Sequence, residues 1–251
     1  MTASSPPLSL RLLRYDTLGS TNDEAKRLAE AGAEDWTLVW ARKQTAGRGR
    51  GGNAFVSPPG NLYVSMILRP PRPAASVAQL GFAAALAVGE AVAPRLPSGH
   101  DLRYKWPNDV LVDGGKLAGI LLESSAGQDG ALAWLVVGMG VNVASHPTGA
   151  AWTATSLAAL GAGAVEIEDL LGSVTVAFQA QTMCWLREGF APIRAAWLAR
   201  AYGLGGTVSV RLPRESFRGR FVDLDRDGVL LLETAEGPRR VAAGEIFAAA
   251  A

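Results

Sequence analysis

An unusual run of glycines and arginines, Gly-Arg-Gly-Arg-Gly-Gly, occupies residues 47–52. Glycine lets a backbone approach a ligand closely, and the guanidinium groups of Arg48 and Arg50 match the geometry of carboxylates and phosphates. No Gly-Lys-Ser/Thr follows, so the run is not a Walker A loop. The segment therefore predicts either an anion-binding loop or a solvated surface loop, including an Arg-Gly fragment of the kind found in RNA-binding proteins.

Three further segments place polar residues beside rigid or apolar neighbours. In the run Lys105-Trp106-Pro107-Asn108-Asp109, the proline stiffens the chain and fixes where the Asn108 and Asp109 side chains point. These two residues could form a simple turn, or Asp109 could hold Mg²⁺ or orient a ligand. Lys116 opens an apolar strand and could be either solvated or part of a site. Asn142 closes another apolar strand, where it could cap a turn or contact a ligand.

A helix is expected to start at the sequence Ser20-Thr21-Asn22. Thr21 and Glu24 have the spacing of a capping box, and apolar residues follow at helical spacing until Gly32. The start of a helix leaves backbone N–H groups without partners. These residues are therefore candidates for binding a polar group.

Strand and helix patterns around these segments predict an α+β fold. We expect strands at 37–41, 62–68, 103–106, 110–112, 117–123 and 132–143. Helices are expected at 74–92, 170–185 and 193–202. After Gly205-Gly206 the pattern changes to short alternating runs, two of them joined by a hairpin turn at 225–228, which predicts a small all-β module. Because strands and helices do not alternate regularly, we expect a mixed sheet flanked by helices rather than a Rossmann fold or TIM barrel.

Composition excludes several classes of function. Of 251 residues, 24 are Lys or Arg and 23 are Asp or Glu, so the net charge is +1. This balance argues against a nucleic-acid partner held by bulk charge. One cysteine excludes a disulfide framework and a cysteine-ligated metal site, and the two histidines leave little room for a histidine site. We find no signal peptide and no segment suited to spanning a membrane, so we expect a cytoplasmic protein without a membrane partner.

Together the motifs resemble one family, the biotin protein ligases, also called biotin–acetyl-CoA-carboxylase ligases. The resemblance covers most of residues 10–145 in the order of the family's motifs. It rests on these segments: Ser20-Thr21-Asn22, Gln44 to Gly51, Lys105 to Asp109, Lys116 to Ile120, and Gly138 to Asn142. It implies a catalytic domain of the biotin/lipoate ligase type, similar to class II tRNA synthetases, over residues 1–203. It also implies an SH3-like β-barrel domain over 204–251.

The resemblance further implies a two-step ligase reaction. The carboxylate of biotin attacks the α-phosphate of MgATP to give biotinyl-5′-AMP and pyrophosphate. A lysine on a biotin carboxyl carrier protein domain of an acyl-CoA carboxylase then attacks this mixed anhydride and releases AMP. Because the first nucleophile is already ionised, the enzyme needs aligned donors and positive charge rather than an activated Ser, Cys or His.

The resemblance also assigns roles to individual residues. The biotin head group is expected to lie against Ser20, Thr21, Asn22 and Gln44. Arg48, Gly49 and Arg50 are expected to bind the biotin carboxylate and the phosphate. Lys116 is expected to bridge the acyl and phosphoryl oxygens, which makes Lys116, Arg50 and Arg48 the catalytic candidates. The nucleotide, with its Mg²⁺, is expected to contact Asn108, Asp109 and Asn142, and Asp109 is the candidate metal ligand.

The chain departs from the family pattern at two places. Phe55 stands where the family commonly has a tryptophan that stacks on adenine, and a phenyl ring offers less area and no N–H. About 19 residues precede Ser20, too few for the winged helix of the repressor-type members, so we expect a member with ligase activity alone.

Two alternatives use the same residues differently. A lipoate- or octanoate-protein ligase or transferase shares the catalytic fold, but its motifs differ from Gly-Arg-Gly-Arg-Gly and Lys-Trp-Pro-Asn-Asp. A binding protein without catalysis, for biotin or for nucleic acid, would use the loop only as a lid or as a basic contact. The sequence does not define the oligomeric state or the acceptor carboxylase.

Overall fold

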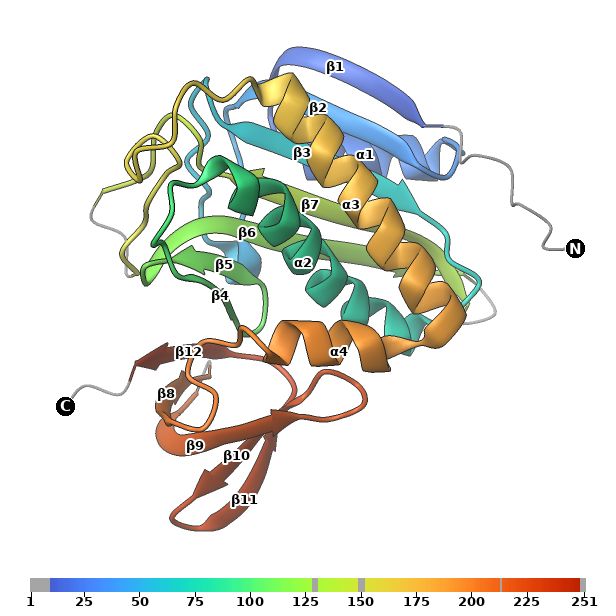
Figure 1. Ribbon diagram of the computed structural model, residues 1–251. Coiled ribbons are helices and arrows are strands. Elements are labelled where there is room, and N and C mark those ends of the chain that lie inside the picture. Colours follow the sequence, from blue (N-terminus) through green and yellow to red (C-terminus); the bar gives the residue numbers. More distant parts are fainter. Residues whose placement is uncertain (1–9, 128–130, 149–151, 213, 249–251) are drawn as a thin grey trace, which may run out of the picture.

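A mixed seven-stranded sheet forms the larger part of the protein, seen here in a computed structural model that describes residues 10–127, 131–148, 152–212 and 214–248. The strand order is β1-β2-β3-β7-β6-β5-β4, with β1 parallel to β2 and the other neighbours antiparallel (Figure 1). The strands are β1 (Arg11–Leu18), β2 (Thr37–Gln44), β3 (Leu62–Leu68), β4 (Leu102–Lys105), β5 (Asp109–Val112), β6 (Gly115–Ala126) and β7 (Leu132–Val141). This arrangement confirms the expected α+β fold with a mixed sheet.

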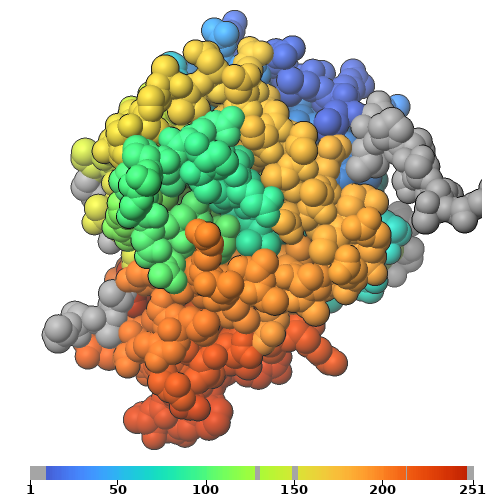
Figure 2. All heavy atoms as spheres, viewed as in Figure 1, coloured from blue at the N-terminus to red at the C-terminus, as the bar shows by residue number. Residues whose placement is uncertain are grey.

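Helices cover the two faces of this sheet unequally. On one face lie α2 (Leu80–Val92) and α3 (Ile167–Glu188), which pack together over the centre of the sheet (Figure 1). Figure 2 shows α3 and the C-terminal sheet as parts of one continuous surface on that side. In the described part of the chain, one short helix, α1 (Thr21–Glu30), covers the opposite face and packs on the sheet through Ala25 and Ala29. The remainder of that face is available for a site.

The central helix α2 lies almost entirely inside the protein. The expected helix at 74–92 is present as a 3-10 turn, η2 (Ala74–Gln79), followed by α2, and a second turn, η3 (Ala93–Arg95), extends it. The stretch Ala74–Arg95 is long and apolar enough to cross a membrane, but 78% of its most apolar window is buried in this fold. It is therefore the core helix of the larger sheet.

The C-terminal part forms a separate antiparallel sheet of five strands with the order β11-β10-β9-β8-β12 (Figure 1). Its strands are β8 (Thr207–Arg211), β9 (Ser216–Leu224), β10 (Leu230–Thr234), β11 (Gly237–Val241) and β12 (Glu245–Ala248). The helix α4 (Phe190–Leu198) precedes it. We propose a domain division between residues 203 and 204, in the segment that joins α4 to β8.

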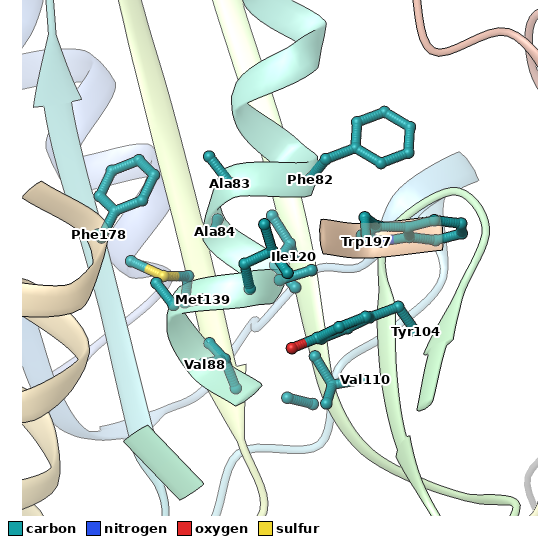
Figure 3. Packing of buried hydrophobic residues seen from close by; sticks show 14 of the residues in the cluster. Phe82, Ala83, Ala84, Val88, Tyr104, Val110, Ile120, Met139, Phe178 and Trp197 are labelled. Carbon is teal, nitrogen blue, oxygen red and sulfur yellow. The ribbon is translucent and has the colours of Figure 1, made fainter. Parts of the chain in front are cut away.

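The C-terminal sheet is joined to the larger sheet by aromatic packing and by hydrogen bonds. Trp197 of α4 packs edge-on against Phe82 of α2 and stacks on Tyr104 of β4, with ring centroids 5.3 and 6.2 Å apart (Figure 3). The indole N–H of Trp106 donates to the carbonyl of Gly228 in the hairpin turn after β9, at 3.1 Å. Trp106 is thus a buried packing residue between the two sheets.

Candidate active site

A floor of glycines lies on the α1 face of the larger sheet. Along β7, Trp134 and Val136 pack under α1, whereas the next residues on that face, Gly138 and Gly140, carry no side chain. Gly140 pairs with Gly119 on the neighbouring strand β6. An added Cβ at Gly138 would lie 2.1 Å from Asn22 Oδ1, and one at Gly140 would lie 2.6 Å from the Phe55 ring. The glycines therefore make room for the side chains that form the site.

The helix start at Ser20 lies beside this floor, but the expected capping box is absent. Ser20 is the N-cap and makes no side-chain capping bond, and Thr21 is the first helical residue. The Thr21 backbone N–H donates instead to Gln44 Oε1 at 2.7 Å, and its hydroxyl lies 3.1 Å from the same oxygen. The capping prediction was wrong because Gln44, distant in sequence, supplies the acceptor that Glu24 would otherwise provide.

The Asn22 side chain is buried, and both the oxygen and the nitrogen of its amide are hydrogen-bonded. Its Oδ1 accepts a hydrogen bond from Ser65 Oγ at 2.6 Å, and its Nδ2 donates to Glu123 Oε2 at 2.9 Å. Gln44 is held in a similar way, because its Nε2 donates to Ser57 Oγ at 2.9 Å. These contacts fix uncharged donors and acceptors at one end of the site.

The Gly-Arg segment, residues 47–52, crosses the site as a loop that contains the single turn η1 (Arg50–Gly52). Gly47 begins the loop at a point where an added Cβ would lie 2.4 Å from the Phe55 carbonyl oxygen, so a larger residue would not fit. The Gly49 N–H donates to the Asn53 carbonyl at 2.7 Å. Arg50 reaches the other sheet, where its guanidinium donates to the Gly244 carbonyl at 3.2 Å. Burial lowers the pKa of Arg50, partly offset by Glu245 and Asp109.

Lys116 and the buried Asp109 form an ion pair at the centre of the site. Lys116 Nζ lies 2.6 Å from Asp109 Oδ1, and Lys105 Nζ lies 2.8 Å from Asp109 Oδ2. Burial alone would raise the pKa of Asp109, but the two ammonium groups outweigh it and lower that pKa. Lys105 is nearly inaccessible, at 4% exposed, whereas the Lys116 side chain is 30% exposed. Lys116 is therefore the ammonium group that a ligand can reach.

The surroundings of Asp109 do not fit a magnesium site. Both carboxylate oxygens are already paired with ammonium groups, and a hard cation would have to displace them. Over the residues that the structure describes, no three His, Cys, Asp or Glu side chains gather into a metal-binding group. Asp109 is a partner of two lysines here rather than a metal ligand.

Asn108 and Asn142 hold the backbone around Lys116. Asn108 Nδ2 donates to the Ile120 carbonyl. Asn142 Nδ2 donates to the carbonyls of Lys116 and Thr155, at 3.3 and 3.0 Å, and Asn142 is buried. These contacts fix the strand that carries Lys116, so both amides have a positioning role whether or not they also contact a ligand.

Two adjoining cavities meet at this ion pair. The first, of about 120 Å³, is lined by every residue named as a site candidate from the sequence except Asn142. The second, of about 440 Å³, includes Asn142. Lys105, Asp109, Lys116 and Phe55 line both cavities. The site is therefore a two-chamber pocket, and the wall that the chambers share carries Lys105 and Lys116 together with the carboxylates of Asp109 and Glu245.

Aromatic side chains line the second cavity. Phe55 is half-buried and packs edge-on against Tyr63, with centroids 6.3 Å apart. Trp152 and Phe247, which the sequence analysis did not select, lie on the far wall with centroids 5.5 Å apart. Lys105 Nζ lies 4.3 Å from the Trp152 ring centroid and 5.5 Å from that of Phe247. No short motif marked these two residues, because they come from a connecting segment and from the last strand.

Comparisons with known proteins agree on one family. Residues 16–142 match the model described as the Biotin/lipoate A/B protein ligase family, and residues 203–248 match the Biotin protein ligase C terminal domain. A biotin–[acetyl-CoA-carboxylase] ligase from Paracoccus denitrificans is 42% identical over 236 residues, covering 91% of this chain and 96% of that relative. The bifunctional ligase/repressor BirA of Bacillus subtilis is 35% identical, over 94% of this chain and 73% of its own length.

Solved structures give the same result. The biotin protein ligase from Aquifex aeolicus in complex with biotin and ATP superposes with a TM-score of 0.78 at 28% identity, covering 94% of this chain and 97% of that one. The Leishmania major biotin protein ligase in complex with biotinyl-5-AMP gives 0.65 at 25% identity, over 98% and 100% of the two chains. The chain therefore belongs to the biotin/lipoate A/B protein ligase family, and within it to the biotin protein ligases.

Proposed function

We propose that this protein attaches biotin to a lysine of a biotin carboxyl carrier protein domain, through biotinyl-5′-AMP formed from biotin and ATP. The observation that carries the proposal is the position of Lys116 at the junction of two cavities. An enzyme that joins two small substrates needs their reacting groups to meet at one place beside a source of positive charge. The names of the relatives support biotin and ATP as the substrates. We also propose a cytoplasmic location, where ATP is supplied.

Biotin is assigned to the first cavity. Its head group is an uncharged cyclic urea, and Ser20, Thr21 and Gln44 offer neutral polar groups at that end. With the head group there, the carboxylate extends towards the cationic end of the cavity, where Arg50 and Lys116 lie. The loop at 47–52 crosses this path and separates the carboxylate from water, which would otherwise hydrolyse a mixed anhydride.

ATP is assigned to the second cavity. A purine needs a flat apolar surface, and Phe55, Trp152 and Phe247 provide aromatic rings on its walls. The α-phosphate then lies at the shared wall, beside Lys116. Asn142 contributes by fixing the backbone of Lys116.

The first step joins the two substrates at that wall. A carboxylate oxygen of biotin attacks the α-phosphorus, a new P–O bond forms, and the bond to the β-phosphate bridging oxygen breaks as pyrophosphate leaves. Negative charge gathers on the phosphoryl oxygens in the transition state, and the ammonium group of Lys116 stabilises it there. No base is required, because the attacking carboxylate carries no proton at neutral pH. We assign no step to a metal at Asp109, since both of its oxygens are paired with lysines.

The second step transfers the acyl group. The neutral amine of the acceptor lysine attacks the acyl carbon of biotinyl-5′-AMP, an amide bond forms, and AMP leaves with the electron pair of the broken C–O bond. The amine loses one proton to solvent or phosphate in the process. The protein's contribution is to retain the anhydride until the acceptor arrives. The loop at 47–52 retains it by covering the first cavity.

Incubation of the purified protein with ATP, biotin and a carrier domain tests this function directly. We expect ATP-dependent biotin on one lysine of the carrier, detected by intact mass. The second candidate, a lipoate or octanoate ligase, predicts attachment of lipoate under the same conditions and none of biotin. A protein that binds biotin but modifies no carrier would be a binding protein only.

A further inference from the structure

Arg48, the first arginine of the loop, lines the first cavity, and its guanidinium is paired with two carboxylates. Its guanidinium lies 2.5 Å from Asp23 Oδ1 and 3.1 Å from Glu123 Oε2. Asp23 is in the first turn of α1, and Glu123 is on β6. Neither acidic residue belongs to the motifs of the sequence analysis. The contacts tie the loop to the sheet and to the helix that form the head-group end of the site.

The same two carboxylates also hold Lys26. Its ammonium lies 2.8 Å from Glu123 Oε1 and 2.9 Å from Asp23 Oδ1. The cluster therefore contains two cations and two anions and is neutral as a whole. A guanidinium that is already neutralised by two carboxylates has little attraction left for an anionic ligand, because the same carboxylates repel that ligand.

Glu123 is well placed to remain charged in this cluster. Burial tends to raise the pKa of Glu123, but Lys26, Asn22 and Arg48 outweigh that effect and lower it. Its side chain is 23% exposed, compared with 51% for Asp23 and 38% for Arg48. Bulk ions consequently screen the Glu123 contact less than the Asp23 contact.

Two residues after Arg48, Arg50 attaches the loop to the C-terminal part of the chain, because its guanidinium donates to the carbonyl of Gly244, just before β12, at 3.2 Å. Directly after Arg50, Gly51 and Gly52 have φ angles of +64° and +80°, a conformation that glycine adopts without strain. Such a segment has many open conformations, so its closed form over the first cavity requires attachment at both sides.

We infer that Asp23 and Glu123 are positioning residues that hold the loop at 47–52 closed, and that Arg48 is the side chain they hold. The inference rests on the proposed function and refines it: Arg48 retains biotin and biotinyl-5′-AMP by closing the loop, whereas Arg50 and Lys116 supply the charge that faces the ligands. This differs from the role that the family resemblance implied for Arg48, a direct contact with the biotin carboxylate.

The experiment measures release and chemistry separately. We use Asp23→Ala and Arg48→Gln, and follow the dissociation of labelled biotin and of labelled biotinyl-5′-AMP in a chase with excess unlabelled biotin. Partly exposed ion pairs contribute modestly, so each variant should release both ligands about 3- to 10-fold faster. For Asp23→Ala, a residue that lines neither cavity, the single-turnover rate of adenylation at saturating biotin and ATP should stay within about 2-fold of wild type.

A matched control and a double variant sharpen the test. Glu24 is also acidic, lies in the same first turn of α1, and pairs with Arg27 instead of Arg48. Glu24→Ala therefore removes the same helix-end charge and should leave release unchanged. The double variant Asp23→Ala/Arg48→Gln should release the ligands no faster than Arg48→Gln alone, because the other contact of Asp23, with Lys26, does not involve the loop. Glu123→Gln should act in the same direction as Asp23→Ala.

Three results would overturn the inference. Release from Asp23→Ala at the wild-type rate would show that the carboxylates do not hold the loop. A loss of 100-fold or more in single-turnover adenylation for Arg48→Gln would place Arg48 on the reacting atoms. Additive effects of the two changes on ligand release in the double variant would show that Asp23 and Arg48 act independently and not through their contact. A wild-type protein that neither binds biotin nor forms the adenylate would instead refute the proposed function, so the two failures are distinguishable.

Discussion

Replacing Lys116 by alanine removes the accessible ammonium group from the junction of the two cavities. Lys105 also lies at the junction, but it is 4% exposed and is engaged by Asp109 and the Trp152 ring, so it does not substitute. Deletion of one donor aimed at developing charge costs about 10²–10³-fold in rate, or roughly 2.7–4 kcal/mol. We expect Lys116→Ala to lower the rate constant of adenylation by that factor while biotin binding changes little.

The stability of this variant is expected to fall by less than its activity. Asp109 keeps Lys105 as a partner at 2.8 Å, so its buried charge is not left alone. Complete loss of pairing for a buried charge costs about 3–5 kcal/mol, and we therefore expect a smaller decrease of about 1–3 kcal/mol in the free energy of unfolding. Urea denaturation checks this value and confirms that the assay is done on folded protein.

Biotin-dependent exchange of labelled pyrophosphate into ATP, measured at saturating substrates, is the assay for the first step. Lys43→Ala is the matched control, because Lys43 is an exposed lysine on β2 that lines neither of the two cavities. It should exchange at the wild-type rate. If folded Lys116→Ala also exchanged within about 3-fold of wild type, an effect of that size being under 1 kcal/mol, Lys116 would not stabilise the transition state.

Three further predictions address the walls and the surroundings of the site. Phe55→Ala should weaken ATP binding by about 1 kcal/mol and biotin binding by less, as measured by calorimetry; equal losses would mean that the ring only packs. Gly138→Ala would place a Cβ 2.1 Å from Asn22 Oδ1 and should raise the KM for biotin about tenfold or more, with a smaller change for ATP. The Asp113 carboxylate, 2.6 Å away, raises the pKa of His100 above its ordinary value of 6.5. The His100–Asp113 pair therefore contributes its full stabilisation below about pH 6.5 and loses it as the pH rises through the raised pKa of His100. The difference in Tm between wild type and His100→Gln should shrink from pH 6 to pH 9, and a constant difference would contradict this.

Local patterns in the sequence were enough to predict most of the elements. The strand expected at 62–68 is β3 with the same bounds, because the mostly apolar run there is buried on both faces. Some ends extend further than the patterns indicated, such as β2, which continues to Gln44. The last strand, β12, was not predicted as a strand, since it consists of four residues at the end of the chain and is defined by its pairing with β8.

The site was predictable as a set of residues but not as a set of contacts. The motif residues gather around one pocket, yet the partners that orient them are distant in sequence. Glu123 is 101 residues from Asn22, and no spacing rule connects a carboxylate late in a strand with a helix start. The same reason explains the wrong capping prediction at Thr21, because its backbone N–H donates to the distant Gln44 and not to Glu24.

The central claim is that biotin and ATP meet at Lys116 to form an acyl-adenylate. The most direct test is to incubate the protein with biotin and ATP in the absence of any acceptor, and to identify the bound product by mass spectrometry together with the nucleotide released after acid quenching. The account predicts biotinyl-5′-AMP in the wild-type protein with stoichiometric pyrophosphate, and little of either in Lys116→Ala over the same time. Formation of ADP and phosphate, or formation of an adenylate with lipoate and not with biotin, would contradict it.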